Sequence, residues 1–365
     1  MYKNKFLFKS KIDFMKLKED FNTNLDDLSY QSEILQHVSR TFALTIPELP
    51  HALRIVISNA YLLCRIADTI EDDKSMSSEK KKEYSELFID VVNKNKDADL
   101  FSEKLFSLLS PEATEAEHNL IANTKKIIRI THSFNNRQRR ALEKCVSKMC
   151  KGMTKYQDLE TLNGLKDIDD MNEYCYFVAG VVGEMLTELF CDYSSDIDAH
   201  QNELMELAIS FGQGLQMTNI LKDIWDDHKR GACWLPSDYF KKHGIDIKQK
   251  SPGKNKSGFE DALLELLSIA YMHLKNALHY TLLIPKKEKG LRKFCLWAIG
   301  MAVLTLEKIR KKPNFTSGKQ VKISHRDVKM TILITSLFVR NNGILRYLFK
   351  FYGRHLPSIS IHERL

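Results

Sequence analysis

Two clusters of acidic residues give this sequence its clearest capacity for chemistry. The first contains Asp68, Glu71 and Asp72 at the end of an apolar stretch, and the second places Asn219, Asp223 and Asp227 at intervals of four. Helical residues four apart are rotated by about 40° and separated by about 6 Å along the axis, so each row leaves one helix face. Such rows of oxygen donors suit Mg²⁺, which keeps several waters and bridges carboxylates to substrate phosphates.

Stability alone would not select the first cluster. The C-terminal end of a helix is negative, so acids there are unfavourable, and two carboxylates four residues apart repel each other by roughly 1 to 3 kcal/mol. A divalent cation would reverse that repulsion. Either cluster alone is also compatible with a solvated acidic helix end. Together, in a chain of net charge +8, they predict metal ions facing each other across a cavity and neutralising a departing diphosphate.

Long helices must position these residues. The 365-residue chain has only 15 Gly and 8 Pro, too few for many short strands and tight turns. Apolar residues recur at helical spacing in seven segments, and this periodicity predicts an all-α fold. The segments are residues 52–72, 117–130, 137–157, 171–192, 203–228, 260–283 and 291–311. Residues 248–258 are predicted to form an exposed loop, and 321–323 show only weak strand-like alternation.

The domain organisation predicted from composition is simple. Without an internal repeat or a low-complexity linker, residues 30–340 are expected to form one domain. Residues 1–29 form a basic N-terminal extension and 341–365 a basic C-terminal tail.

The longest apolar run, residues 330–339, is too short to span a bilayer, and no apolar export segment follows the N-terminus. We therefore expect a cytoplasmic protein. The seven cysteines lack a CxxC pair, which favours buried thiols over zinc or disulfides.

Four motifs in order give the chain a resemblance to squalene and phytoene synthases. They are residues 39–42, 61–72, 174–183 and 216–227, and the likeness extends over roughly residues 30–335. The resemblance implies the isoprenoid-synthase helical fold with a central cavity. It also implies a prenyltransferase of isoprenoid biosynthesis, on a pathway to sterols or hopanoids. That enzyme joins two prenyl diphosphates head to head, with presqualene diphosphate as the intermediate of the C30 branch.

The same resemblance implies roles for residues of this chain. Tyr174 would help to deprotonate the first carbocation, with diphosphate as the ultimate base, and Tyr61 and Arg65 would assist. The two acidic clusters would bind Mg²⁺, and further polar residues would contact substrate or cofactor. The metal ligands would be Asp68, Glu71, Asp72, Asn219, Asp223 and Asp227, and the binding residues Ser39, Arg40, Gln216 and Lys222.

Several of these assignments have structural alternatives. Tyr174 could be a core tyrosine with a bonded hydroxyl, and Arg65 could pair with an acid on its own helix. Gly180 and Gly183 each cost up to about 1 kcal/mol inside a helix, which indicates a need for space beside the backbone. A prenyl chain or a closely packed helix could occupy that space.

The product depends on a segment near the C-terminus. Residues 320–324 resemble the squalene synthase segment whose lysine and a second basic residue contact NADPH phosphate. Lys322 matches, whereas the second position is Ser324, with Arg326 nearby. We expect farnesyl diphosphate as substrate, NADPH as reductant and squalene as product. Phytoene, dehydrosqualene or presqualene diphosphate, formed without reduction, are the alternatives, and the C15 or C20 length of the substrate and the oligomeric state stay open.

The C-terminal tail and the net charge raise the question of partners. Basic residues alternate with Leu345, Leu348, Phe349 and Phe351, which predicts peripheral contact with an anionic membrane, with a frayed tail as the alternative. A different class, a basic helical nucleic-acid-binding or scaffold protein, would leave the acid clusters unexplained because they repel phosphate. We therefore expect no nucleic-acid partner.

Overall fold

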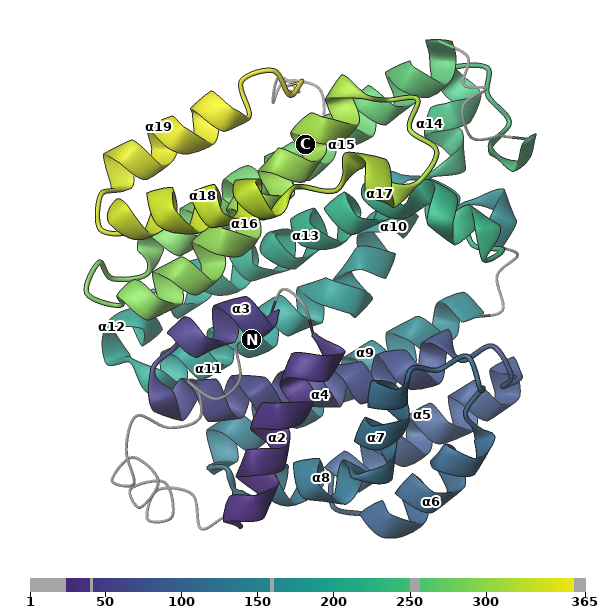
Figure 1. Cartoon of the computed structure of the whole chain (residues 1–365), viewed down its shortest axis with the longest axis vertical. Helices are drawn as coiled ribbons and strands as arrows, with labels where there is room; N and C mark the ends of the chain where they lie inside the picture. The colour runs from purple at the N-terminus through teal and green to yellow at the C-terminus, as the bar shows by residue number, and fades with distance from the viewer. Residues whose placement is uncertain (1–23, 40–41, 158–160, 250–256, 358–365) are drawn as a thin grey trace. The chain divides into compact units, whose positions relative to one another are not determined.

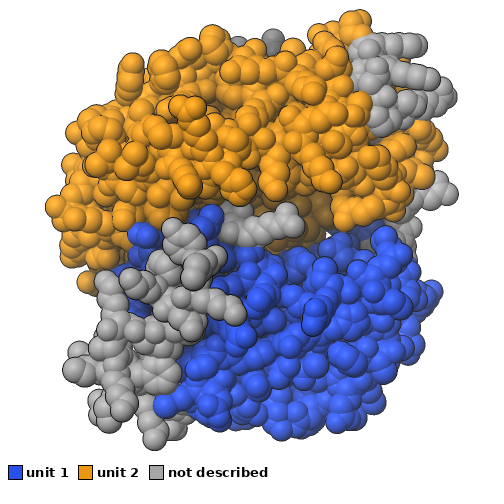
Figure 2. All heavy atoms as spheres, in the orientation of Figure 1, with its two compact units in different colours: residues 1–158, 188–193 blue, residues 159–187, 194–365 orange. Residues whose placement is uncertain are grey.

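The computed structural model describes residues 24–39, 42–157, 161–249 and 257–357 (Figure 1). These residues form helices and contain no strand, and their one bridge pairs Leu165 with Pro236. The chain divides into two compact units, residues 1–158 with 188–193, and residues 159–187 with 194–365 (Figure 2). The domain limits predicted at residues 30 and 340 stay a prediction.

The first unit is built around α4, His51–Asp72, which is apolar around most of its circumference. Val56, Leu62 and Ile66 are fully buried, and α4 lies against α2, α5, α8 and α9. The helices of this unit are α2 (Leu25–Val38), α3 (Phe42–Thr45), the 3₁₀ turn η1 (Ile46–Glu48), α4, α5 (Ser78–Val92), α6 (Ala98–Leu108), α7 (Glu115–Ala122), α8 (Thr124–Ser133) and α9 (Asn136–Gln157).

Buried polar contacts fix α4 and α2 against α8. The Asn59 amide donates to the Ile127 carbonyl at 3.0 Å and accepts from the Thr131 hydroxyl at 2.7 Å. Arg129 donates two hydrogen bonds, of 2.7 and 2.6 Å, to the buried carboxylate of Asp27. A buried polar group that lost its partner would cost about 1 to 3 kcal/mol, so these contacts define how the three helices pack.

The second unit is organised by α13, Gln201–Lys229, which packs along α15, Ser257–Leu283. Its other elements are η2 (Thr161–Asn163), α10 (Ile168–Cys175), the π-helical turn η3 (Tyr176–Gly180), α11 (Val181–Tyr193, whose last turn belongs to the first unit), α12 (Ser195–Asp198), α14 (Ser237–Lys242), η4 (Ile247–Gln249), α16 (Lys289–Lys311), α17 (Gly318–Val321), α18 (His325–Leu337) and α19 (Asn342–Tyr352).

Glycines allow close helix packing in this unit. A Cβ atom on Gly183 would lie 2.3 Å from the Ala208 carbonyl oxygen, and one on Gly212 would lie 2.3 Å from the Ala179 carbonyl oxygen. The space beside Gly183 is therefore filled by the backbone of α13. This supports the packing alternative for that glycine over the prenyl-chain alternative.

Arg292 anchors the C-terminal helices. Its guanidinium is fully buried and donates to the carbonyls of Ile284 and Val339 and to the side-chain oxygen of Asn342, at 2.6 to 2.8 Å. It thereby ties the α18–α19 turn to α16. The residues of α19 that face α16, Leu345 and Phe349, are buried, so the expected tail contains a packed helix, and the frayed alternative is wrong for residues 342–352.

The predicted helices are confirmed with two exceptions, one of which is the helix predicted over 171–192, which the π-helical turn η3 divides into α10 and α11. The segment predicted as one helix over 117–130 is two helices, because α7 ends at Ala122 and α8 begins at Thr124. All seven cysteine side chains are buried thiols, as expected. The stretch Ile168–Tyr193 is long and apolar enough to cross a membrane, although half of its most apolar window is buried and a core helix meets the same criteria. Most of the predicted 248–258 loop lies outside the described residues.

Candidate active-site residues

The first acidic cluster lies on the last turns of α4. Asp68 and Glu71 are half-buried and Asp72 is exposed. Burial and the neighbouring charge of Asp72 raise the pKa of Asp68 to about 7, and burial with Asp72 and Asp68 raises the pKa of Glu71 to about 8. Carboxylates that oppose one another's ionisation are suited to binding a cation, because a divalent ion would relieve both burial and repulsion.

Asp73, the next residue, holds the end of this helix in place. Its carboxylate accepts from the Ser75 backbone at 2.8 Å and hydroxyl at 2.7 Å, from the Met76 backbone at 3.1 Å, and from the Ser110 backbone at 2.7 Å. Burial alone would raise the pKa of Asp73, but these hydrogen bonds lower it on balance. Asp73 therefore has a structural task, distinct from that of the three acids before it.

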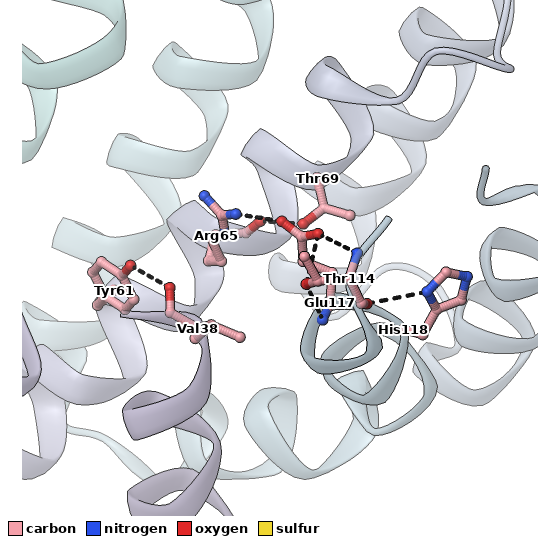
Figure 3. A network of polar contacts seen from close by, with 7 residues as sticks. All are labelled: Val38, Tyr61, Arg65, Thr69, Thr114, Glu117 and His118. Carbon is pink, nitrogen blue, oxygen red and sulfur yellow. Dashed lines mark hydrogen bonds and ion pairs between the residues drawn. The ribbon is translucent and has the colours of Figure 1, made fainter. Parts of the chain in front are cut away.

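Arg65 is engaged with an acid from another helix (Figure 3). Its guanidinium forms a salt bridge with Glu117, whose second oxygen accepts 2.8 Å hydrogen bonds from the Thr114 backbone and hydroxyl in a capping box at the start of α7. Although burial disfavours its charge, Asp68 and Glu117 raise the pKa of Arg65 on balance. Arg65 thus stands between the acid cluster and α7, and Glu117 is a partner that the sequence did not reveal.

Tyr61 and Ser39 lie near the start of the same unit. The Tyr61 hydroxyl donates to the Val38 carbonyl at 3.0 Å (Figure 3), and its ring contacts Phe42 at a centroid distance of 5.2 Å. Burial raises the pKa of Tyr61, so this hydroxyl stays protonated at neutral pH. The Ser39 hydroxyl accepts from the Phe42 backbone at 3.1 Å. Arg40 lies outside the described residues.

The second acidic cluster, on α13, is neutralised by cations of the chain. Lys222 donates to the Asn219 amide oxygen at 3.4 Å and lies 3.1 Å from the Asp223 carboxylate. Asp227 forms a salt bridge with Arg230. Burial raises the pKa of Asp227 although Arg230 opposes the shift. Asn219 is exposed, and Gln216 and Asp223 are half-buried.

The segment around α17 lies directly on this cluster. The Gly318 backbone donates to Asp226 at 2.9 Å, and a Cβ atom on Gly318 would lie 2.6 Å from the Asp223 carboxylate. The segment that resembles a cofactor-binding sequence is therefore joined to the second acid cluster. Only the absence of a side chain at residue 318 permits this contact, and neither Gly318 nor Asp226 was among the predicted site residues.

Tyr174 lies in the last turn of α10, two residues before the first residue of the π-helical turn η3. It is buried and stacks on Trp234 with a centroid distance of 4.2 Å and an interplanar angle of 7°. A π-helical turn changes the direction of the side chains that follow it and is frequent at functional sites. In the same turn, Tyr176 donates to Glu184 at 3.3 Å. Trp234 is the partner that the sequence motif did not indicate.

Of the residues in the segment that resembles a cofactor-binding sequence, two are exposed cations and one caps a helix. Lys322 and Arg326 are exposed, and the Lys322 carbonyl accepts from Lys308 at 3.0 Å. Ser324 is the N-cap of α18. Its hydroxyl accepts a hydrogen bond from the Asp327 backbone at 3.1 Å, and the Asp327 carboxylate accepts one from the Ser324 backbone at 2.8 Å. The serine found where a second basic residue was expected therefore has a structural explanation.

The oxygen donors of both clusters fit Mg²⁺. Within the described ranges, no group of three or more His, Cys, Asp and Glu side chains is arranged to hold a metal ion by itself. Magnesium usually takes only one or two carboxylates and completes its shell with water and substrate phosphate oxygens. The donor chemistry, together with the raised pKa values in the first cluster, is compatible with that mode of binding.

The chain is similar in sequence to proteins of known family. The family model described as squalene/phytoene synthase matches residues 35–327. Squalene synthase ERG9 of Gibberella zeae is 30% identical over 85% of this chain, and that of Candida albicans is 30% identical over 78%. The chain spans 64% and 62% of their respective lengths.

Solved structures show the fold. The structure of TcSQS in complex with the ligand BPH1237 superposes on this chain with a TM-score of 0.72 and 21% sequence identity. The match covers 93% of this chain and 94% of the TcSQS chain. A dehydrosqualene synthase bound to a ligand has a TM-score of 0.63 and 18% identity, with 90% and 99% coverage. The predicted all-α isoprenoid-synthase fold is confirmed.

Proposed function

Because the chain belongs to the squalene/phytoene synthase family, we propose that it is a prenyltransferase. It joins two molecules of farnesyl diphosphate head to head through presqualene diphosphate, and reduces that intermediate to squalene with NADPH. The observation that carries the proposal is the cluster of Asp68, Glu71 and Asp72, whose carboxylates oppose one another's ionisation. Such a cluster is stabilised by cations, and a diphosphate substrate brings cations with it.

Each residue would contribute in a defined way. The first acidic cluster, and Asn219, Asp223 and Asp227 of the second, would hold Mg²⁺, which when bound neutralises charge on the departing diphosphate. Arg65 and Lys222 already neutralise carboxylates beside these clusters and would also contact diphosphate oxygens. Ser39, Arg40 and Gln216 are further proposed binding residues.

Two tyrosines would serve the carbocation steps. The Tyr174 ring is held flat against Trp234, which restricts its orientation and offers an aromatic face beside a developing positive charge. Tyr174 would relay the proton lost from the first carbocation, with departed diphosphate as its final acceptor. Tyr61, with its high pKa, would act as a neutral hydrogen-bonding group.

The reductive step has a competing proposal. Lys322 and Arg326 are exposed cations that suit the phosphate groups of NADPH. Ser324, however, caps α18 and supplies no charge. This observation favours a second candidate, head-to-head condensation without reduction, which would end at presqualene diphosphate or dehydrosqualene from farnesyl diphosphate, or at phytoene from geranylgeranyl diphosphate.

One incubation separates these candidates. Purified protein is mixed with farnesyl diphosphate and Mg²⁺, with and without NADPH, and the lipids are identified by mass spectrometry. Squalene formed only with NADPH supports the first candidate, and presqualene diphosphate in both tubes supports the second. No condensation product from either farnesyl or geranylgeranyl diphosphate would contradict both.

We extend the proposal to location. The enzyme is proposed to work in the cytoplasm and to contact membranes through its basic C-terminal segment, because its product is insoluble in water. This contact is independent of the chemistry and is tested separately.

A further inference from the structure

The helices α18 and α19 expose apolar side chains that have no part in the proposed chemistry. On α18, Met330, Leu333 and Leu337 have exposed fractions of 44%, 52% and 69%. Their spacing of three and four places them on one face of the helix. Lys329 and Arg340 are exposed beside them, so this α18 stripe is a row of aliphatic side chains with positive charge close to each end.

The outer face of α19 has the same character with aromatic residues. Tyr347 and Phe351 are 65% and 45% exposed, and their rings lie 6.1 Å apart in a stacked arrangement. Arg346 and Lys350 are exposed next to them, and the Arg354 guanidinium lies 4.3 Å from the centre of the Phe351 ring. We call these residues the α19 stripe.

The α19 stripe is separate from the face that folds the helix. Leu345 and Phe349 are buried on the opposite side, and the Phe349 ring stacks on Tyr271 at a centroid distance of 5.1 Å. Of the four apolar tail residues predicted to contact a membrane, these two are therefore core residues. Only Phe351 is exposed, and Tyr347 joins it in their place.

A groove lies between α18 and α19. It has a volume of about 250 Å³, and it is lined by Leu296 and Ile299 of α16 and by residues of α18 and α19. Met330 and Tyr352 line this groove and are also exposed at 44% and 38%. The groove lies on the inner side of α19, away from the α19 stripe, and we call the two exposed stripes together the α18–α19 face.

The charge on this face is of one sign. Residues 328–357 contain five Lys or Arg and no Asp or Glu. Among the described residues, none forms an ion pair with Lys329, Arg340, Arg346 or Lys350. Asp327, the acid just before this segment, is engaged with Lys308 at 3.1 Å.

These properties identify the class of partner. A second copy of the same face would bring five positive charges against five, so self-association is disfavoured. A nucleic acid would use the cations, but an aliphatic row on α18 would add nothing to phosphate binding. An anionic bilayer uses both features, because its headgroups attract Lys and Arg while aromatic and aliphatic side chains enter the boundary with the acyl chains.

We propose that the α18–α19 face is a membrane-docking surface specific for anionic lipid bilayers. It deepens the proposed membrane contact by naming the residues that make it, and it requires no step of the proposed chemistry. In the docked state, Leu333, Leu337, Tyr347 and Phe351 lie at the level of the headgroups.

Vesicle flotation with the full chain tests this surface. The vesicles contain phosphatidylcholine alone or with about 30% phosphatidylglycerol, at about 0.1 M salt. The wild-type chain is expected to float with the anionic vesicles and to remain behind with the neutral ones. Arg346→Gln with Lys350→Gln should weaken binding about thirtyfold, since each cation near the surface contributes about one factor of five. Leu333→Ser with Leu337→Ser should weaken it at least about tenfold.

Matched pairs on α6 and α5 serve as controls. Leu100→Ser with Phe106→Ser removes two side chains of similar exposure (52% and 45%), and Lys82→Gln with Lys104→Gln removes two exposed cations. Both control pairs should bind vesicles as the wild type does. Equal losses in test and control pairs, equal binding to neutral vesicles, or binding to single-stranded RNA with none to vesicles would each overturn the proposal.

A separate readout distinguishes failure of this surface from failure of the proposed function. Asp68→Asn should abolish product formation and retain vesicle binding, whereas the α18–α19 variants should retain turnover of detergent-dispersed substrate. If the wild type binds vesicles but forms no prenyl product, the docking surface stands and the proposed function fails. If it forms product but does not bind vesicles, the proposed function stands and the docking surface is overturned.

Discussion

Gly318→Ala adds a single methyl group beside the second acidic cluster and tests whether that cluster binds metal. The new Cβ atom would lie 2.6 Å from an Asp223 carboxylate oxygen, 3.0 Å from an Asp226 carboxylate oxygen and 3.2 Å from the Lys222 carbonyl oxygen. Ordinary contacts require about 3.5 Å, so the Asp223 carboxylate must withdraw by about 0.9 Å.

The cost to stability should be small and the cost to metal binding large. A carboxylate can rotate away at an expense of about 0.5 to 1.5 kcal/mol. If α17 moves instead, the bond from Gly318 to Asp226 weakens, and a hydrogen bond to a charged group contributes about 1.5 to 3 kcal/mol. Displacing a ligand or its support typically lowers metal affinity or activity by about 10- to 100-fold.

The assay compares the Mg²⁺ dependence of product formation with stability in urea. Gly318→Ala is expected to raise the Mg²⁺ concentration for half-maximal activity at least about tenfold and to lower the unfolding free energy by no more than about 3 kcal/mol. Gly343→Ala is the control, since its new Cβ atom would lie 3.4 Å from its nearest neighbour. An unchanged Mg²⁺ dependence in Gly318→Ala would refute a metal-binding role for Asp223.

Three further predictions concern other parts of the chain. Burial lowers the pKa of His273 from 6.5 to about 4, so between these pH values the unfolded chain binds a proton that the folded chain does not. The free energy of unfolding should therefore fall by about 3 kcal/mol as the pH drops from about 6.5 to 4. In urea titrations at several pH values, His273→Asn should lack this pH-dependent loss of stability. Gly183→Ala should destabilise the protein by at least about 2 kcal/mol in thermal unfolding, because its Cβ atom would meet backbone at 2.3 Å; a wild-type melting temperature would show that α11 and α13 separate easily. Asp73→Ala removes four hydrogen bonds and should cost about 3 kcal/mol in urea unfolding, whereas Asp97→Ala removes one cap bond and should cost about 1 kcal/mol; equal costs would contradict this account.

The helices of this fold could be predicted because their signal is local. Apolar spacing located α4, α9, α13, α15 and α16 within a few residues of their ends. The break at Asn123 could not be predicted in this way, because apolar periodicity continues across it and no Gly or Pro marks it. Shorter helices such as α5 and α6 were not predicted either, although the cap residues Ser77 and Asp97 that begin them are signals that sequence can supply.

The partners of the candidate site residues could not be predicted for a different reason. Glu117 is 52 residues from Arg65, and Trp234 and Gly318 lie on other elements than Tyr174 and Asp226. No spacing rule links residues across such distances, because their proximity depends on how helices pack. The motif identified which side chains could react, and tertiary packing decides what surrounds each of them.

The buried guanidinium of Arg292 has a consequence for how the protein would reach a lipid surface. Releasing the α18–α19 turn would strand a desolvated cation, so both helices are held in their final form before any encounter. Amphipathic peptides commonly gain helix as they adsorb, and part of their binding energy is consumed by ordering. Here the circular dichroism of the chain should stay the same on adsorption, and attachment should be as fast as diffusion and charge allow.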